Sequence, residues 1–308
     1  MIELYKAIWR VSWGRQLLLV LLSVAIAALA AAPLEFQKRI VNLLTEEGTD
    51  LDHLLLLGGG MLGVILASLG IKWARGFLAN VLGEDVIRMI RRRLLSEAET
   101  DEASGKQLRR GTLTTAISAE AEELGQFAGA AYSEPVVQIG TLISVVTFIS
   151  ATQPALGIIA LSMIVPQIVI VLISQRKVNI FVALRVRALR AATDHVSAEK
   201  LRDASDEVLA RFDEIYETRR RMFIWKMSAK FLLSTINGLG TVGVLMLGGW
   251  LVYEGRTDVG TVVAAASGLG RIQGPTSFLI AFYRQVSSNR IKFELLRELI
   301  VPPPSSRT

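Results

Sequence analysis

The residues with chemical potential inside the apolar parts of this chain are few, and they suit binding better than bond breaking. Arg271 lies within the apolar run 262–282 with Gln273 beside it, and Glu134 and Gln138 lie at the start of another apolar run. An unpaired guanidinium in hydrocarbon costs at least ~2.5 to 3.5 kcal/mol, so Arg271 must face water or a partner. Two alternatives follow. Either Arg271 and its neighbours line a cavity that favours anionic or amphipathic solutes, or Arg271 forms a structural ion pair with Glu134.

The residue types that catalysis or metal binding would need are missing or isolated. Cysteine is absent, and the two histidines, His53 and His195, fall on opposite sides of the predicted membrane. The pair Gly105-Lys106 lacks the upstream glycine of a phosphate-binding loop. We therefore expect no catalytic site, no metal ion and no cofactor bound by this chain.

The elements that must position these residues are membrane-spanning helices. Hydrophobic residues make up 51% of the chain, and several apolar runs approach the ~20 residues that a transmembrane helix needs. The third run is short, but small residues before it let the helix begin earlier. We predict an all-α, polytopic membrane protein with six long transmembrane helices, whose apolar parts are 17–34, 54–71, 136–149, 155–174, 231–252 and 262–282.

The distribution of basic residues predicts the topology. The net charge is +6, yet the linkers 45–53 and 151–153 contain no Lys or Arg and 253–259 has only Arg256, whereas 72–127 and 175–230 are rich in both. Basic loops remain in the cytoplasm. We expect an integral plasma (bacterial inner) membrane protein that contacts lipids and not nucleic acid, with both chain ends cytoplasmic. Lys72 and Arg75 are interpreted as side chains that snorkel to the headgroups.

The N-terminal residues have the pattern of a short interfacial helix. Leu4, Ile8 and Val11 form one face, while Lys6 and Arg10 lie elsewhere. A cleaved signal peptide is the alternative, but the following apolar run is longer than usual for one. The predicted organisation is an elbow helix at 1–15, a six-helix membrane domain at 16–300 and a short tail at 301–308.

The two charged inner stretches are predicted to be helical hairpins. Val86, Ile87, Ile90, Leu94 and Leu95 recur at helical spacing. At ~1.5 Å per residue, each hairpin would carry its tip on the order of 30 Å beyond the membrane, where a cytoplasmic partner could bind it.

Two motifs resemble the transmembrane domain of ATP-binding-cassette (ABC) exporters of type 1. The segment GGWLVYEGRTDVGTVVAA (248–265) is similar to the paired glycines, outer turn and start of helix six in that family, and Pro275 falls at its recurrent proline, where a kink is expected. The segment GTLTTAISAEAEELGQ (111–126) resembles the first coupling region. By this resemblance, the partner-coupling residues are Gly111, Thr112, Ser118 and Glu120, together with Arg202 and Asp203 in the second inner stretch.

The resemblance implies a dimer with a second copy or a related chain, and a separate nucleotide-binding ATPase subunit that carries ATP and Mg. The chain ends at Thr308, where a fused ATPase domain would begin in the family, so the alternatives of a longer natural chain and of transport without ATP stay open. The second coupling helix is not found between His195 and Tyr216, and that segment looks shortened.

The preferred function is therefore the permease subunit of an ABC exporter-like transporter that moves a lipid, peptide or amphipathic small molecule by alternating access. One alternative is a non-transporting scaffold or regulator that kept the fold. The other is an ion-coupled transporter, for which Glu134 and then Glu35 are the candidate protonatable carboxylates.

Overall fold

The computed structural model describes residues 2–46, 50–103, 116–197 and 205–300, and every element in these ranges is a helix. They are α1 (Ile2–Leu29), α2 (Ala32–Thr45), α3 (Leu51–Ala103), η1 (Ala116–Glu120), α5 (Ala121–Ala130), α6 (Ser133–Thr152), α7 (Pro154–Ser197), α8 (Ser205–Tyr253) and α9 (Val259–Ile300). The tail predicted for 301–308 lies outside the described residues. The predicted all-α fold is confirmed, with α1 and α2 forming one pass and α5 and α6 another.

Five helical stretches among the described residues are long and apolar enough to cross a membrane: Ile2–Thr45, Leu51–Ser96, Ile117–Thr152, Pro154–Phe181 and Phe212–Tyr253. Each contains one of the first five predicted spans. The sixth predicted span lies in α9, which is not among the five. Its apolar run is diluted by Arg271, Gln273 and several small residues.

The first pass is interrupted twice. The backbone of α1 leaves helical geometry at Ser12 (φ −141°, ψ 26°), and the residues before Ser12 form a separate N-terminal segment. A second break separates α1 from α2, which begins at Ala32 and carries Pro33 in its first turn, where the missing N–H of proline costs no helical hydrogen bond. Each break leaves space or unpaired polar groups that other helices fill or bind.

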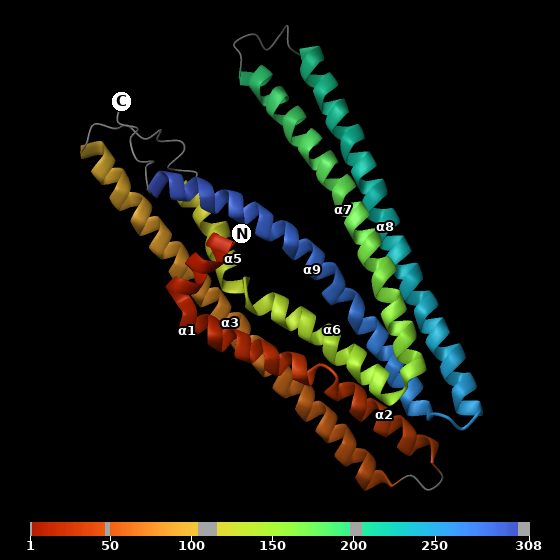
Figure 1. The fold of residues 1–308 in the computed structure, drawn as a ribbon. Coiled ribbons are helices and arrows are strands. Elements are labelled where there is room, and N and C mark those ends of the chain that lie inside the picture. The colour runs from red at the N-terminus through yellow and green to blue at the C-terminus, as the bar shows by residue number, and fades with distance from the viewer. Residues whose placement is uncertain (1, 47–49, 104–115, 198–204, 301–308) are drawn as a thin grey trace.

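The passes run up and down and meet at one end through short connections. Figure 1 shows the end of α2, the junction of α6 with α7 and the turn between α8 and α9 gathered at one end of the molecule. At the opposite end α7 and α8, which pack along each other, lie well apart from the ends of α3 and α9. With 53, 44, 49 and 42 residues, α3, α7, α8 and α9 extend far beyond their predicted spans.

The turn between α8 and α9 is held by two local motifs. Gly255 has a positive φ of 71°, and the amides of Gly255 and Arg256 donate to the carbonyls of Val252 and Leu251 at 2.9 Å each. This is a Schellman helix end, which favours glycine. It accounts for the glycine in the outer-turn motif of the sequence.

Asp258 then caps α9. Its carboxylate accepts hydrogen bonds from the backbone N–H of Thr261 at 2.6 Å and from the Thr261 hydroxyl at 2.8 Å. Burial acts to raise the pKa of Asp258, but the hydrogen bonds from Asn42 and Thr261 and the charge of Lys38 outweigh it and hold the pKa below its usual value. The ionised cap is therefore the favoured form.

Two apolar clusters hold the passes together. One lies where the N-terminal segment of α1 meets α3, α5 and α9, around Leu4, Leu82, Phe127 and Phe282. The other lies nearer the connections, where Leu34, Ile149, Val244 and Leu269 bring together α2, α6, α8 and α9. The described helices α7 and α8 therefore join the rest of the chain mainly through the second cluster.

A glycine allows α2 and α9 to touch. A Cβ added to Gly260 would meet the carbonyl oxygen of Lys38 and the side chain of Asn42, whose Oδ1 accepts the Gly260 N–H at 2.7 Å. We predict that Gly260→Ala lowers the free energy of unfolding by roughly 1 to 3 kcal/mol, because backbone atoms must move apart. Thermal unfolding of the purified chain in detergent measures this.

The matched control is Gly249→Ala in α8, where nothing lies within 4 Å of an added Cβ. That change should leave stability unaltered or slightly raised, since alanine favours the helix. Equal midpoints for the two variants would contradict the tight contact.

Candidate functional site

The best-defined polar group at membrane depth joins α3 to α6. Arg75 Nη2 lies 2.7 Å from Glu134 Oε1, and the two side chains are 13% and 26% exposed. Gln138 Nε2, one turn along α6, donates to Glu134 Oε2 at 3.4 Å. The structure thus brings together two predicted site residues, Glu134 and Gln138, but their partner is Arg75.

This pairing corrects two interpretations of the sequence. The snorkelling role of Arg75 is wrong, because its charge is neutralised inside the chain, while Lys72 stays exposed. The ion pair between Arg271 and Glu134 is also wrong. The signal that was missed is spacing: Arg75 falls on the same face of α3 as Leu82 and Val86, which are both buried.

The level of Arg75 follows from a second ion pair. Arg15, just before the first predicted span, pairs with Asp85 of α3. Arg75 lies ten residues from Asp85 toward the opposite end of α3, or about 15 Å along the helix axis. The charged stretch from residue 72, which was predicted to lie outside the membrane, therefore begins beside the first span. At that level Arg75 lies within the membrane, where an unpaired charge would be costly.

Arg271 is held by the break between α1 and α2. The amide of Leu34 donates to Ala31 O at 2.9 Å and not to Ala30 O, the acceptor it would use in an unbroken helix. Arg271 Nη1 donates to that carbonyl of Ala30 at 3.0 Å. One guanidinium N–H thus satisfies a carbonyl that the break between α1 and α2 releases, while the side chain remains exposed on the chain surface.

The remaining predicted site residues of α9 lie around this contact. Gln273 is half-buried and Pro275 is buried. The helix is continuous through Pro275, so the predicted kink there stays a prediction. One turn before Arg271, Ser267 Oγ accepts a hydrogen bond from Gln37 Nε2 of α2 at 2.9 Å, a polar contact that sequence reasoning missed.

Two of the six predicted coupling residues can be placed. Ser118 and Glu120 lie in η1, while Gly111, Thr112, Arg202 and Asp203 fall outside the described residues. The segment is tied to α3 because Arg91 Nε donates to Ile117 O at 2.9 Å. Arg91 Nη2 also lies 3.9 Å from Glu122 at the start of α5.

The described residues contain no group of three or more His, Cys, Asp or Glu side chains that could hold a metal ion. The polar groups of the helices described above are amides, hydroxyls and charged side chains. Such groups can bind and orient a solute or fix helices.

Comparison with known families agrees with this picture. Residues 16–196 match the ABC transporter transmembrane region, which covers more than half of the chain. The protein therefore belongs to the family of ABC transporter transmembrane regions, and it is an integral membrane protein and a component of a membrane transporter. A search of curated proteins found no match.

The Arg75–Glu134 pair can be tested by a double-mutant cycle. Arg75→Leu or Glu134→Leu should each lower the free energy of unfolding by on the order of 3 kcal/mol, because each leaves a buried charge without its partner. The double variant should cost less than the sum of the two, as measured by thermal unfolding in detergent.

The control cycle uses Glu35 and Arg39, an i, i+4 pair on α2 at 2.7 Å. That exposed pair should contribute only ~0.3 to 0.5 kcal/mol. Simple additivity at Arg75 and Glu134 would show that they do not interact in the folded protein.

Proposed function

We propose that this chain is the permease subunit of an ABC exporter-type transporter, moving a lipid, peptide or amphipathic small molecule by alternating access while a separate subunit hydrolyses ATP. The observation that carries the proposal is the family match together with helices that run far past their spans at one end of the molecule. A partner without an apolar surface can bind such extensions. ATP and Mg belong to that partner.

The second half of the transport pathway comes from another copy of this chain or from a related one. Figure 1 shows α7 and α8 diverging from the rest of the chain. Among the large apolar side chains that α8 exposes are those of Phe223, Ile224, Met227 and Phe231. A second membrane chain packed against these helices would cover that surface and enclose a path between the two subunits. Within one chain, α7 and α8 contact few other helices there besides each other. This leaves room for a second chain and supports the arrangement.

The coupling route starts at η1. Arg91 fixes this segment to α3, and Lys292 of α9 pairs with Glu123 of α5, so a push on η1 reaches two long helices through ionic contacts. Movement of the ATPase subunits would then be transmitted to the membrane along α3 and α9. The matching contact on the second inner stretch, around Arg202 and Asp203, is proposed from family likeness.

We place the extended helix ends on the cytoplasmic side of a bacterial inner membrane. Both chain termini lie on the same side in this proposal. The support is the excess of Lys and Arg in the two inner stretches, compared with linkers 45–53 and 151–153 that contain none. Reporter fusions at residues 100 and 205 test this placement, and an exterior signal at either would overturn it.

The central prediction is ATPase association. A soluble ATPase should stay attached when the chain is purified from its native membrane, and the reconstituted complex should hydrolyse ATP faster when substrate is present. A stable chain with no attached ATPase would favour the scaffold or regulator. Transport that follows an ion gradient without ATP would favour the ion-coupled alternative.

Coupling depends on Arg91. Arg91→Ala should lower substrate-stimulated ATP hydrolysis roughly tenfold, because η1 loses a charge-assisted hydrogen bond to α3, while basal hydrolysis by the attached ATPase remains. The control is Arg220→Ala, which removes an exposed pair with Glu217 on α8. Equal stimulation in both variants would remove the coupling role of Arg91.

Substrate binding is expected to involve Arg271. Arg271→Gln should raise the KM for an anionic amphipathic substrate roughly tenfold, because the neutral amide cannot make a charge-assisted hydrogen bond. Transport into vesicles measures this, with unfolding temperature recorded to separate binding from stability. Arg256→Gln, in the outer turn, is the control, and unchanged transport in Arg271→Gln would make that residue purely structural.

A further inference from the structure

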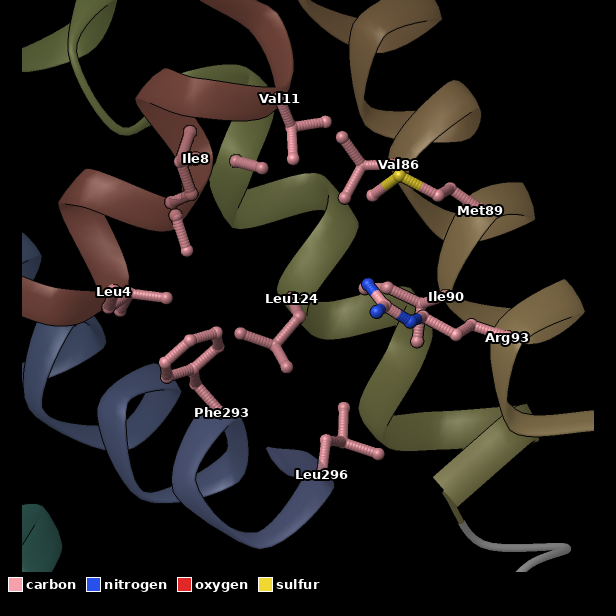
Figure 2. Close-up of a pocket in the computed structure, with 12 residues that line it drawn as sticks. Leu4, Ile8, Val11, Val86, Met89, Ile90, Arg93, Leu124, Phe293 and Leu296 are labelled. Carbon is pink, nitrogen blue, oxygen red and sulfur yellow. The ribbon is translucent and has the colours of Figure 1, made fainter. Parts of the chain in front are cut away.

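An apolar cavity lies beneath the N-terminal segment of α1. Its volume is about 300 Å³, within the range of ligand pockets, and four elements contribute to its walls. Figure 2 shows Leu4 and Ile8 of α1 facing Leu124 of α5 across this space, with Phe293 and Leu296 of α9 closing one side. The remaining wall is α3, which contributes Val86, Met89, Ile90 and Arg93.

The cavity lies at the level where the first pass begins. Arg15 pairs with Asp85, so Val86 and the following turns of α3 lie beside the segment of α1 before the bend at Ser12. Exposed Lys6, Trp9 and Arg10 occupy that segment together with buried Leu4 and Ile8. This distribution is typical of a helix that lies at the boundary between headgroups and acyl chains.

The charge at the cavity is positive. Arg93 is the one charged residue in the lining, and Figure 2 shows its guanidinium directed from α3 toward the space beside Leu124. Arg88 and Arg92 are exposed nearby and share an adjacent surface hollow with Arg93. The described residues offer these three arginines no ion-pair partner, since Asp85 of the same hollow is taken by Arg15.

We propose that this cavity holds an acyl chain of an anionic phospholipid whose phosphate binds Arg93. The apolar lining suits a hydrocarbon chain, the single guanidinium suits one phosphate, and basic pockets at a membrane boundary attract anionic headgroups. A soluble metabolite would leave its polar groups without partners along walls of Leu, Ile, Val and Phe. The site stands apart from transport, because it needs neither an ATPase nor a second chain.

Photo-crosslinking with the wild-type chain tests the location. The purified full chain is placed in nanodiscs that contain phosphatidylglycerol with a diazirine on its acyl chain. The expected crosslinks fall on peptides that contain Leu124 or Phe293, and unlabelled phosphatidylglycerol should compete better than phosphatidylcholine. Labelling confined to the exposed faces of α3 and α8 would overturn the proposal.

Variants at Arg93 test the headgroup contact. In Arg93→Gln, the preference for phosphatidylglycerol over phosphatidylcholine, measured by native mass spectrometry, should fall roughly fivefold. Arg10→Gln is the control, since it removes an exposed arginine of the N-terminal segment that does not line the cavity. An equal loss in both variants would show that general surface charge, and not this site, selects the lipid.

Filling the cavity tests the acyl chain. Ala7 lines the space, so Ala7→Leu should reduce the crosslinks to Leu124 and Phe293 several-fold, whereas Ala7→Ser, of nearly unchanged size, should keep them. Undiminished crosslinks in a folded Ala7→Leu protein would contradict the proposal. The wild-type competition experiment decides the question should that variant fail to fold.

Discussion

Polar groups at membrane depth have to find partners within the protein, and this constraint organises the whole chain. Hydrocarbon offers no hydrogen bonds, so an orphaned charge or carbonyl there is costly. Arg75 meets it by pairing with Glu134, and buried Gln16 by donating to Ala128 O at 2.8 Å. Arg271 meets this constraint by donating a hydrogen bond to the carbonyl of Ala30. Each of these contacts joins helices that are distant in sequence.

These contacts also decide which helices are tied to one another. The pair Arg75–Glu134 ties α3 to α6, and Gln37 with Ser267 ties α2 to α9. Because Gln16 also ties α1 to α5, the first, second, third and sixth passes form one interconnected group. The helices α7 and α8 depend mostly on apolar packing near the connections. A body and a hairpin that meet at one end would suit the alternating access proposed above, because the far ends make few contacts with each other.

Much of the architecture could be predicted from the sequence because its causes are local. Apolar runs of sufficient length predict helices, and the outer turn that the resemblance at 248–265 implies is formed by the Schellman end at Gly255 and the cap at Asp258. The helical spacing of Val86, Ile87, Ile90, Leu94 and Leu95 correctly indicated a helix beyond the apolar run, although Leu95 is exposed. Pattern and propensity act over a few residues, so they can be recognised without a fold.

The partners of the charged residues could not be obtained in that way. Arg75 looked like a snorkelling side chain because its distance from Glu134 along the chain is 59 residues, and only packing of α3 against α6 brings them together. For Arg271, the structural alternative named Glu134 as the partner and missed the carbonyl of Ala30, which is available only because the helix breaks between α1 and α2.

The amino-acid sequence by itself determined an all-helical membrane domain with long charged extensions, and two motifs gave its resemblance to ABC exporters. Hydrophobicity and periodicity suffice for the helices, because each helix satisfies its own backbone. The tertiary structure decided which side chains neutralise one another, how the N-terminal segment covers a cavity, and that Arg93 lies in its wall. Those features depend on the register between helices, which is set by side-chain packing over the whole domain.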